Sequence, residues 1–194
     1  MTPKIAAEAA KVLAAGGTVV YPTETVYGIG ASAFIPEAVE RVFEIKGRSR
    51  EMPLSVAVAS FEMIGLVASV GEEEIRLLRK VLPGPVTVLV KKSPDLPDLV
   101  TAGSPLVGIR FPDHPMALEL IGMAGPITST SANLSGQPPP ASIEELDPKI
   151  AGMVDLVLDG GRSRFASPST LIDLGGRKVI REGAGIDSAR ELLG

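Results

Sequence analysis

Residues 18–30 read TVVYPTETVYGIG, a β-branched run that ends at a proline and leads into a loop of hydroxyl groups, one carboxylate and two glycines. The run 18–21 predicts a buried strand, because β-branched and aromatic side chains favour extended backbone. Ahead of it, residues 4–15 carry apolar side chains at helical spacing and stop at two glycines, which predicts a helix. A second helical pattern begins after Pro36 and ends near Lys46. Helix, strand, loop and helix therefore follow one another around this stretch.

The rest of the chain continues the alternation. Further strands are predicted at residues 54–58, 86–90, 107–111, 126–130, 154–158, 170–174 and 178–181. Further helices are predicted at residues 62–68, 72–82 and 116–121 and at the C-terminus, and residues 93–105 read as a loop. Interleaved helices and strands, with strands clustered late in the chain, indicate an α/β fold with a mixed sheet and flanking helices. A single domain is expected over residues 1–194.

The amino-acid composition excludes several kinds of functional site. With 194 residues, of which 45% are hydrophobic, the chain can bury one sizeable core. It has no cysteine and one histidine, His114, so thiolate sites and a histidine-rich metal cluster are excluded and no metal ligands are predicted. The formal net charge is -4, so the surface as a whole does not attract phosphate groups. Any phosphate site must therefore be a local cluster of positive side chains. No apolar run approaches the roughly 18 residues that span a bilayer, so we expect a cytoplasmic protein with no membrane partner.

Three cations close together mark the end of the second helix. Lys46, Arg48 and Arg50 alternate with Gly47 and Ser49. A lysine supplies a point charge and an arginine a planar fork for phosphate oxygens. Cations at a helix C-terminus also have a purely structural explanation, because they face the negative end of the helix dipole. Both explanations remain open from this segment alone.

A second polar segment, residues 126–136, reads PITSTSANLSG. Here a strand runs into five hydroxyl groups and one amide, which can bind phosphate, ribose or carboxylate without adding charge. The alternative is a loop that uses its serines and Asn133 to cap a neighbouring helix.

Strand ends, where the sites of α/β proteins collect, also carry polar residues at Arg110, Ser169 and Arg181. Arg110 lies in an apolar strand, and an unpaired buried guanidinium is costly. It should therefore meet a carboxylate, either from a ligand or from the protein. Glu24 is the competing partner within the chain.

Taken together, these motifs resemble the YrdC-like family of threonylcarbamoyl-AMP synthases, in its short, single-domain form. The resemblance rests on PTETVYG at 22–28, KGR at 46–48 with Pro53-Leu54, PGPVT at 83–87, IRFP at 109–112, STSANLSG at 129–136, STLID at 169–173 and REG at 181–183. It covers the chain from about residue 5 to the end. Met52 departs from the family pattern, which commonly has an asparagine there, and this removes one polar contact with ATP.

The resemblance implies a twisted α/β sheet with a positive cleft. The residues it implies for ATP binding are Lys46, Arg48, Ser131, Asn133 and Arg181, with Lys46 and Arg48 as the catalytic pair. The residues it implies for threonine binding are Thr23, Thr25, Tyr27, Arg110, Ser129 and Ser169.

The activity implied by the resemblance is that of a nucleotidyltransferase, L-threonylcarbamoyladenylate synthase. It would form threonylcarbamoyl-AMP and pyrophosphate from L-threonine, bicarbonate or CO2 and ATP, for the threonylcarbamoyladenosine modification of tRNA. ATP is then a substrate that carries Mg2+. Downstream tRNA threonylcarbamoyl-transfer enzymes would take the product, and a weak contact with tRNA is expected.

Two other functions compete with this one. An RNA-binding module for double-stranded RNA or tRNA, without catalysis, would use the cations at 46–50. The negative net charge, two tyrosines and no tryptophan argue against it, because RNA readers commonly stack bases on aromatic rings. A related enzyme that acts on another amino acid or carbamoyl donor is the second alternative.

Overall fold

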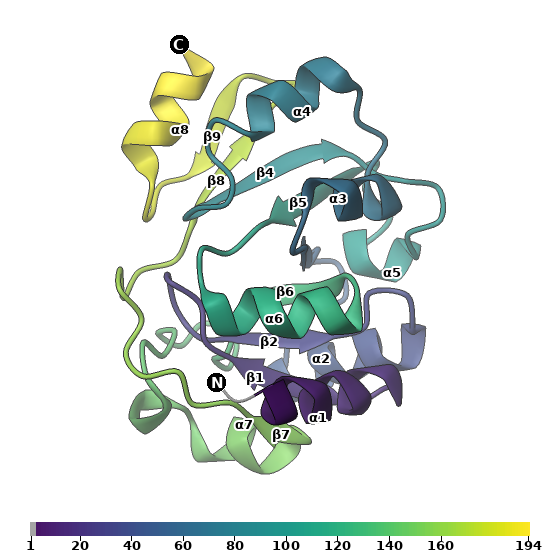
Figure 1. Cartoon of the computed structure of the whole chain (residues 1–194), viewed down its shortest axis with the longest axis vertical. Helices are drawn as coiled ribbons and strands as arrows, with labels where there is room; N and C mark the ends of the chain where they lie inside the picture. Colours follow the sequence, from purple (N-terminus) through teal and green to yellow (C-terminus); the bar gives the residue numbers. More distant parts are fainter. Residues whose placement is uncertain (1–2) are drawn as a thin grey trace.

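A nine-stranded mixed sheet runs through the molecule, with helices packed on both faces (Figure 1). The computed structural model describes residues 3–194, so residues 1–2 of the predicted domain lie outside the described residues. The strands are β1 (Thr18–Tyr21), β2 (Gly28–Ala31), β3 (Ser55–Ala57), β4 (Val86–Lys91), β5 (Leu106–Arg110), β6 (Ile127–Ser131), β7 (Leu156–Val157), β8 (Thr170–Asp173) and β9 (Lys178–Arg181). The helices are α1 (Pro3–Ala14), α2 (Pro36–Lys46), α3 (Phe61–Val67), α4 (Glu72–Leu78), α5 (Asp98–Thr101), α6 (Pro115–Ala124), the 3-10 turn η1 (Ile143–Glu145), α7 (Pro148–Met153) and α8 (Ile186–Leu193).

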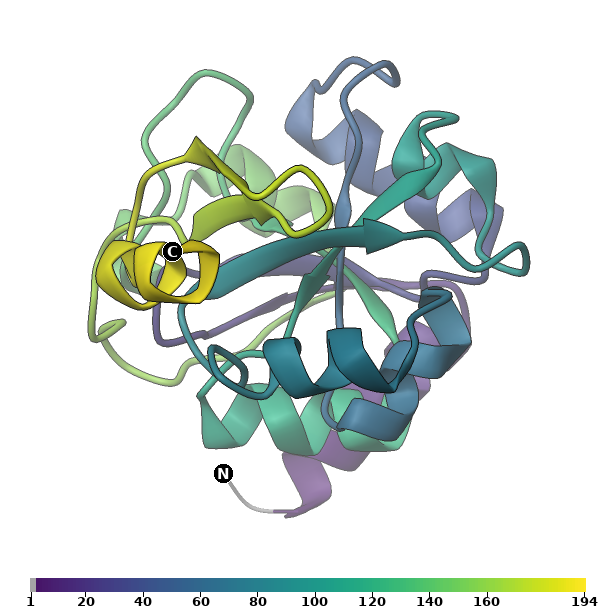
Figure 2. The ribbon, with the colours of Figure 1, turned by 90° about the horizontal axis from the view of Figure 1, so that it is seen from above.

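The sheet order is β7-β1-β2-β6-β3-β5-β4-β8-β9. The pairs β1–β7, β3–β5 and β4–β8 are parallel, and the remaining neighbours are antiparallel. Seen from above, the strands turn steadily from β1 and β2 toward β4, so the sheet is strongly twisted (Figure 2). The predicted α/β fold with a mixed sheet and flanking helices is confirmed.

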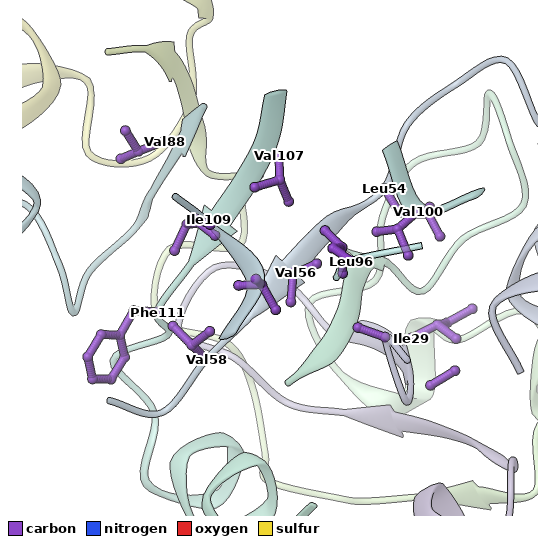
Figure 3. Close-up of a cluster of buried hydrophobic side chains, with 14 of the residues drawn as sticks. Ile29, Leu54, Val56, Val58, Val88, Leu96, Val100, Val107, Ile109 and Phe111 are labelled. Atoms are coloured by element: carbon purple, nitrogen blue, oxygen red, sulfur yellow. The ribbon is translucent and has the colours of Figure 1, made fainter. Parts of the chain in front are cut away.

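Alternation along the strands divides the core between the two faces of the sheet. Val19 and Tyr21 of β1 pack in a cluster with α1 and α6, whereas Val20 joins the larger cluster on the other face. On β3, Val56 and Ala57 divide in the same way. Figure 3 shows the larger cluster, in which side chains from β2, β3, β4 and β5 meet. Since successive side chains of a strand point to opposite faces, both faces of the central strands are buried.

Strand β2 was missed by the sequence prediction, which left residues 22–30 as a loop after the first strand. Its two glycines disfavour a strand locally, but β1 and β6 pair with it on either side. A Cβ on Gly30 would lie 2.7 Å from the Ile127 Cδ1 atom and 3.0 Å from the Tyr21 ring. Glycine is therefore required here by close packing, and tertiary contacts override the low strand propensity.

Smaller differences concern element lengths. The predicted loop 93–105 contains α5, and α4 stops at Leu78 where a helix to residue 82 was predicted. The strand predicted at 154–158 is reduced to β7, and α7, which the sequence did not predict, precedes it. Among residues 3–194, no helix is both long and apolar enough to cross a membrane.

Candidate active site

A cavity of about 350 Å³ opens on the face of the sheet that α1 and α6 cover elsewhere. Along β6, Ile127 packs against these helices, and Ser129 and Ser131, two and four residues later, line the cavity. Along β3, Ala57 is covered and Ser55 is in the cavity. Side chains two residues apart on a strand share a face, so each strand passes from an apolar end under the helices to a hydroxyl-bearing end at the cavity.

All the residues predicted for the site line this cavity except Lys46. The lining comprises Thr23, Thr25, Val26, Tyr27, Gly28, Arg48, Pro53, Leu54, Ser55, Thr87, Arg110, Ser129, Thr130, Ser131, Asn133, Gln137, Pro139, Pro168, Ser169, Leu171 and Arg181. The topology thus brings together residues that lie as far apart in the sequence as Thr23 and Arg181. No aspartate or glutamate is among the lining residues of the described chain.

One part of the cavity is rich in hydroxyl groups. The Thr25 and Thr23 Oγ1 atoms lie 2.8 Å apart, and the Thr23 hydroxyl lies 2.7 Å from the Val26 carbonyl oxygen. The Ser169 Oγ atom lies 2.8 Å from the Thr87 Oγ1 atom. These bonds fix the orientation of the hydroxyls before any ligand arrives. Pre-oriented hydroxyls suit a small polar ligand.

Arg110 lies beside these hydroxyls and is paired within the protein. Its Nη2 atom donates to the Glu24 Oε1 atom at 2.6 Å, and the two side chains are 5% and 3% exposed. Its Nη1 atom donates to the Gly84 carbonyl and, at 3.3 Å, to the Phe111 carbonyl. Of the two partners that the sequence left open for Arg110, the protein carboxylate is therefore present. Arg110 still lines the cavity, so its guanidinium is held in a fixed position there, with its charge offset by Glu24.

The cationic part of the cavity is formed by Arg48 and Arg181. Arg48 donates to the Met52 carbonyl at 3.2 Å and to the Pro53 carbonyl at 2.9 Å, and Arg181 donates to the Ser169 carbonyl at 2.9 Å. Burial, followed by the nearby Arg181 charge, lowers the pKa of Arg48, and burial lowers the pKa of Arg181. Two arginines held close together by carbonyls rather than by carboxylates leave their charge available to an anion.

A bulge in β9 gives Arg181 its place. Ile172 pairs with Val179, whereas Leu171 pairs with Arg181, so Ile180 is an extra residue in the ladder. In an uninterrupted ladder Ile180 would lie opposite Leu171, and Arg181 would lie on the other face. The bulge re-aims the strand and puts Arg181 on the face that Leu171 presents to the cavity.

Lys46 differs from the prediction. It is 2% exposed and does not line the cavity. Its Nζ atom donates to the Ser131 carbonyl and, at 2.7 Å, to the Asn133 carbonyl. Burial, followed by the nearby Arg48 charge, lowers the pKa of Lys46 to about 7. A helix-end cation is usually exposed, so the sequence pattern gave no signal of this burial.

Tyr27, predicted to bind threonine, uses its hydroxyl within the protein. The hydroxyl donates to the Gly161 carbonyl at 2.7 Å and accepts from the Gly160 amide at 3.0 Å. The hydroxyl is therefore engaged within the protein, and the residue is fully buried in the larger hydrophobic cluster. Conversely, Thr87 and Ser55 line the cavity and were not predicted. Thr87 lies in the PGPVT motif, which was a signal for it, whereas a serine at the start of a short strand gave none.

Comparison with known proteins agrees with the motifs found in the sequence. The family model Sua5_yciO_yrdC, described as telomere recombination, matches residues 11–183. The chain belongs to this family. The resemblance found in the motifs is thereby confirmed.

Relatives with similar sequences carry one name. The chain is 42% identical over 161 residues to the threonylcarbamoyl-AMP synthase of Pyrococcus abyssi, which covers 82% of this chain and 47% of that protein. It is 40% identical over 184 residues to a putative threonylcarbamoyl-AMP synthase of Mycobacterium tuberculosis, covering 93% of this chain and 85% of that protein. The chain thus spans about half the length of the Pyrococcus abyssi relative.

Solved structures agree with the sequence matches. The crystal structure of P. abyssi Sua5 complexed with L-threonine matches 100% of this chain and 58% of that chain, with a TM-score of 0.93 and 36% identity. E. coli YciO matches 96% of this chain and 93% of that chain, with a TM-score of 0.86 and 26% identity.

Proposed function

We propose that this chain is an L-threonylcarbamoyladenylate synthase, a nucleotidyltransferase that makes threonylcarbamoyl-AMP and pyrophosphate from L-threonine, bicarbonate or CO2 and ATP. The observation that carries the proposal is a cavity in which two arginines that donate to backbone carbonyls adjoin a wall of fixed hydroxyls. The names of the relatives and the threonine bound to P. abyssi Sua5 support it. The product would serve tRNA threonylcarbamoyladenosine modification through downstream transfer enzymes.

In the proposed reaction the threonine amine attacks the carbon of CO2 and loses a proton, or condenses with bicarbonate and releases water, to give a carbamate. A carbamate oxygen then attacks the α-phosphorus of ATP, and the bond to the bridging oxygen of the β-phosphate breaks, so that pyrophosphate leaves with the electron pair. Every reacting atom belongs to a substrate. The protein's part is to orient the substrates and to offset the charge that develops on the phosphoryl oxygens.

Two groups of residues would divide this work. Arg48, Arg181, Ser131 and Asn133 would hold ATP, with the two guanidiniums facing phosphate oxygens. Thr25, Arg110, Ser129 and Ser169 would hold threonine, with Arg110 next to its carboxylate, while Thr23 braces Thr25 and Tyr27 completes the wall.

Mg2+ is expected to arrive with ATP. Magnesium prefers oxygen ligands, usually carboxylates, phosphates and water, and no carboxylate lines the cavity among the described residues. The phosphates and water would therefore supply most of the ligands.

The test is pyrophosphate release with ATP, Mg2+, threonine and bicarbonate, from which each substrate is omitted in turn and to which no tRNA is added. We expect release only when all the substrates are present, and less with serine, because a missing methyl group in an apolar pocket costs about 1–3 kcal/mol. Arg48→Met should lose most of the activity. Arg50→Met is the matched control, because Arg50 is exposed, pairs with Glu40 and does not line the cavity.

Release that is equal without threonine would overturn the proposal. A strict requirement for added tRNA, or RNA binding that weakens steeply with salt while no ATP is consumed, would favour the RNA-binding module instead, since counterion release scales with the number of phosphates contacted. Weak RNA binding beside RNA-independent release would leave the synthase standing.

A further inference from the structure

Lys46 is the last residue of α2 and lies behind the segment 131–135, which forms part of the cavity wall. Three hydrogen bonds join the two. The Lys46 amine donates to the carbonyls of Ser131 and Asn133, and the Ser135 amide donates to the Lys46 carbonyl at 2.9 Å. Neither partner of the amine is a carboxylate, so the buried amine is held by carbonyl oxygens.

The segment that Lys46 holds carries groups assigned above to ATP. Asn133 folds its side chain back, with Nδ2 donating to the carbonyls of Leu134 at 2.8 Å and Gln137 at 2.7 Å. The Ala132 amide donates to the Tyr27 carbonyl at 2.8 Å. Without the amine, the Asn133 carbonyl would lose the donor that Lys46 supplies, and the Ser131 carbonyl would keep only the Asn133 amide at 3.0 Å. Leaving a partly buried carbonyl without its donor is costly. The turn would then relax, and with it the side chains of Ser131 and Asn133.

We propose that Lys46 is a positioning residue, which serves the nucleotide by fixing the backbone of residues 131–135 and makes no direct contact with the phosphates. Arg48, two residues later, meets the cavity itself. One helix end would thus supply two cations with different tasks. This inference rests on the proposed function for its ligand, but the geometry it invokes exists before any ligand binds.

The two roles predict different behaviour in the nucleotide-free protein. A direct phosphate ligand has no effect on segment 131–137 until ATP is present, whereas a positioning residue holds the segment at all times. Hydrogen exchange of the Ala132, Ser135 and Gln137 amides, all of which are hydrogen-bonded, reports on this. Lys46→Met keeps the apolar stem and removes the donor, and Arg48→Met is the matched control.

We expect Lys46→Met to raise exchange in segment 131–137 at least tenfold without nucleotide, with α1 and α6 unchanged, and to lose most of the pyrophosphate release. Arg48→Met should lose release and keep the wild-type exchange. Lys46→Gln, which retains one donor group, serves if the methionine variant does not fold, and should give a smaller increase confined to the same segment.

Wild-type exchange in the segment of a Lys46→Met variant that has lost activity would overturn the proposal, because the lysine would then act directly. Loss of protection throughout the chain in both Lys46 variants would also overturn it, since Lys46 would be holding the fold as a whole. Absence of pyrophosphate release by the wild-type chain would count against the proposed function alone, because the exchange result does not depend on turnover.

Discussion

The Arg110 side chain is 5% exposed, and its Nη2 atom lies 2.6 Å from the Glu24 Oε1 atom. A buried pair of this kind contributes little net stability compared with an apolar pair, but removing one partner leaves the other charge uncompensated. The Glu24 Oε2 atom already lacks a hydrogen-bond partner within the described residues. Removing either member of the pair should therefore lower the free energy of unfolding markedly.

Arg110→Ala and Glu24→Gln should each lower the free energy of unfolding by about 3–5 kcal/mol. The matched control is Arg190→Ala, which breaks the exposed pair with Glu182 and should cost about 0–1 kcal/mol. Urea denaturation followed by circular dichroism measures all three. Equal, small losses in the three variants would show that the Arg110 pair is not buried in solution.

Lys46 makes stability depend on pH. Burial and the neighbouring Arg48 lower its pKa from 10.5 to about 7. The folded chain therefore releases this proton near pH 7, whereas the unfolded chain keeps it until about pH 10.5. Between these values the unfolded state binds more protons, so the free energy of unfolding rises with pH, by up to about 1.4 kcal/mol per pH unit.

This rise should be absent from Lys46→Met. Urea denaturation of both proteins at pH 7.5, 8.5 and 9.5 gives the difference in unfolding free energy, which should grow in favour of the wild type as pH increases. A constant difference would mean that the buried amine keeps its proton across this range.

At the scale of elements, one glycine of β5 packs directly against two residues that line the cavity. Gly108 of β5 lies between Ser55 and Thr87, and a Cβ added to it would lie 2.6 Å from the Ser55 Oγ atom and 3.2 Å from the Thr87 Cγ2 atom. Both neighbours line the cavity, so a larger residue at position 108 must push them into the space a ligand needs.

Gly108→Ala should therefore raise KM for threonine or ATP at least several-fold, and overpacking should cost about 1–3 kcal/mol of stability. Gly122→Ala on α6 is the control: a Cβ there meets open space, and alanine should stabilise the helix by about 0.5–1 kcal/mol. Steady-state kinetics and thermal melts on both variants separate the two effects. Unchanged KM values in Gly108→Ala would show that the ligands do not contact Ser55 or Thr87.

Prediction from sequence succeeded for the elements and site segments that carry a local signal. Hydroxyl-dense strand ends marked Ser129, Ser131 and Ser169 correctly as lining residues. Features that depend on packing were missed: β2, because glycine is required there by a neighbouring ring, and the burial of Lys46, because helix-end cations are usually exposed. For Arg110 the sequence could not decide between ligand and protein as the partner, since either supplies a carboxylate.

At the scale of the whole molecule, the cavity wall draws on both halves of the sheet. Residues 23–28 and β6 come from one side of the strand order, and β4, β8 and β9 come from the other. A ligand that contacts both sides binds only the folded chain. Its binding should therefore raise the free energy of unfolding, by about 2.7 kcal/mol at a concentration about 100-fold above Kd.

ATP and threonine should each raise the melting temperature, and Arg181→Ala should abolish most of the ATP effect while leaving the threonine effect. Lys178→Ala is the matched control, because Lys178 lies on the same strand but does not line the cavity. Thermal melts with each ligand measure this. Equal loss of both effects in Arg181→Ala would contradict the division of the cavity into two groups of residues.

The extra residue in β9 also constrains how this protein can change length. The turn between β8 and β9, residues 174–177, precedes the first paired residue of β9. It can therefore grow or shrink without altering which face Arg181 occupies. Within β9 itself, pairing without the bulge would place Ile180 on the cavity face and Arg181 on the opposite face. In natural variation and in engineering alike, this hairpin should therefore tolerate insertions in its turn. A change of length that removes the bulge should not be tolerated, because Arg181 would then leave the cavity.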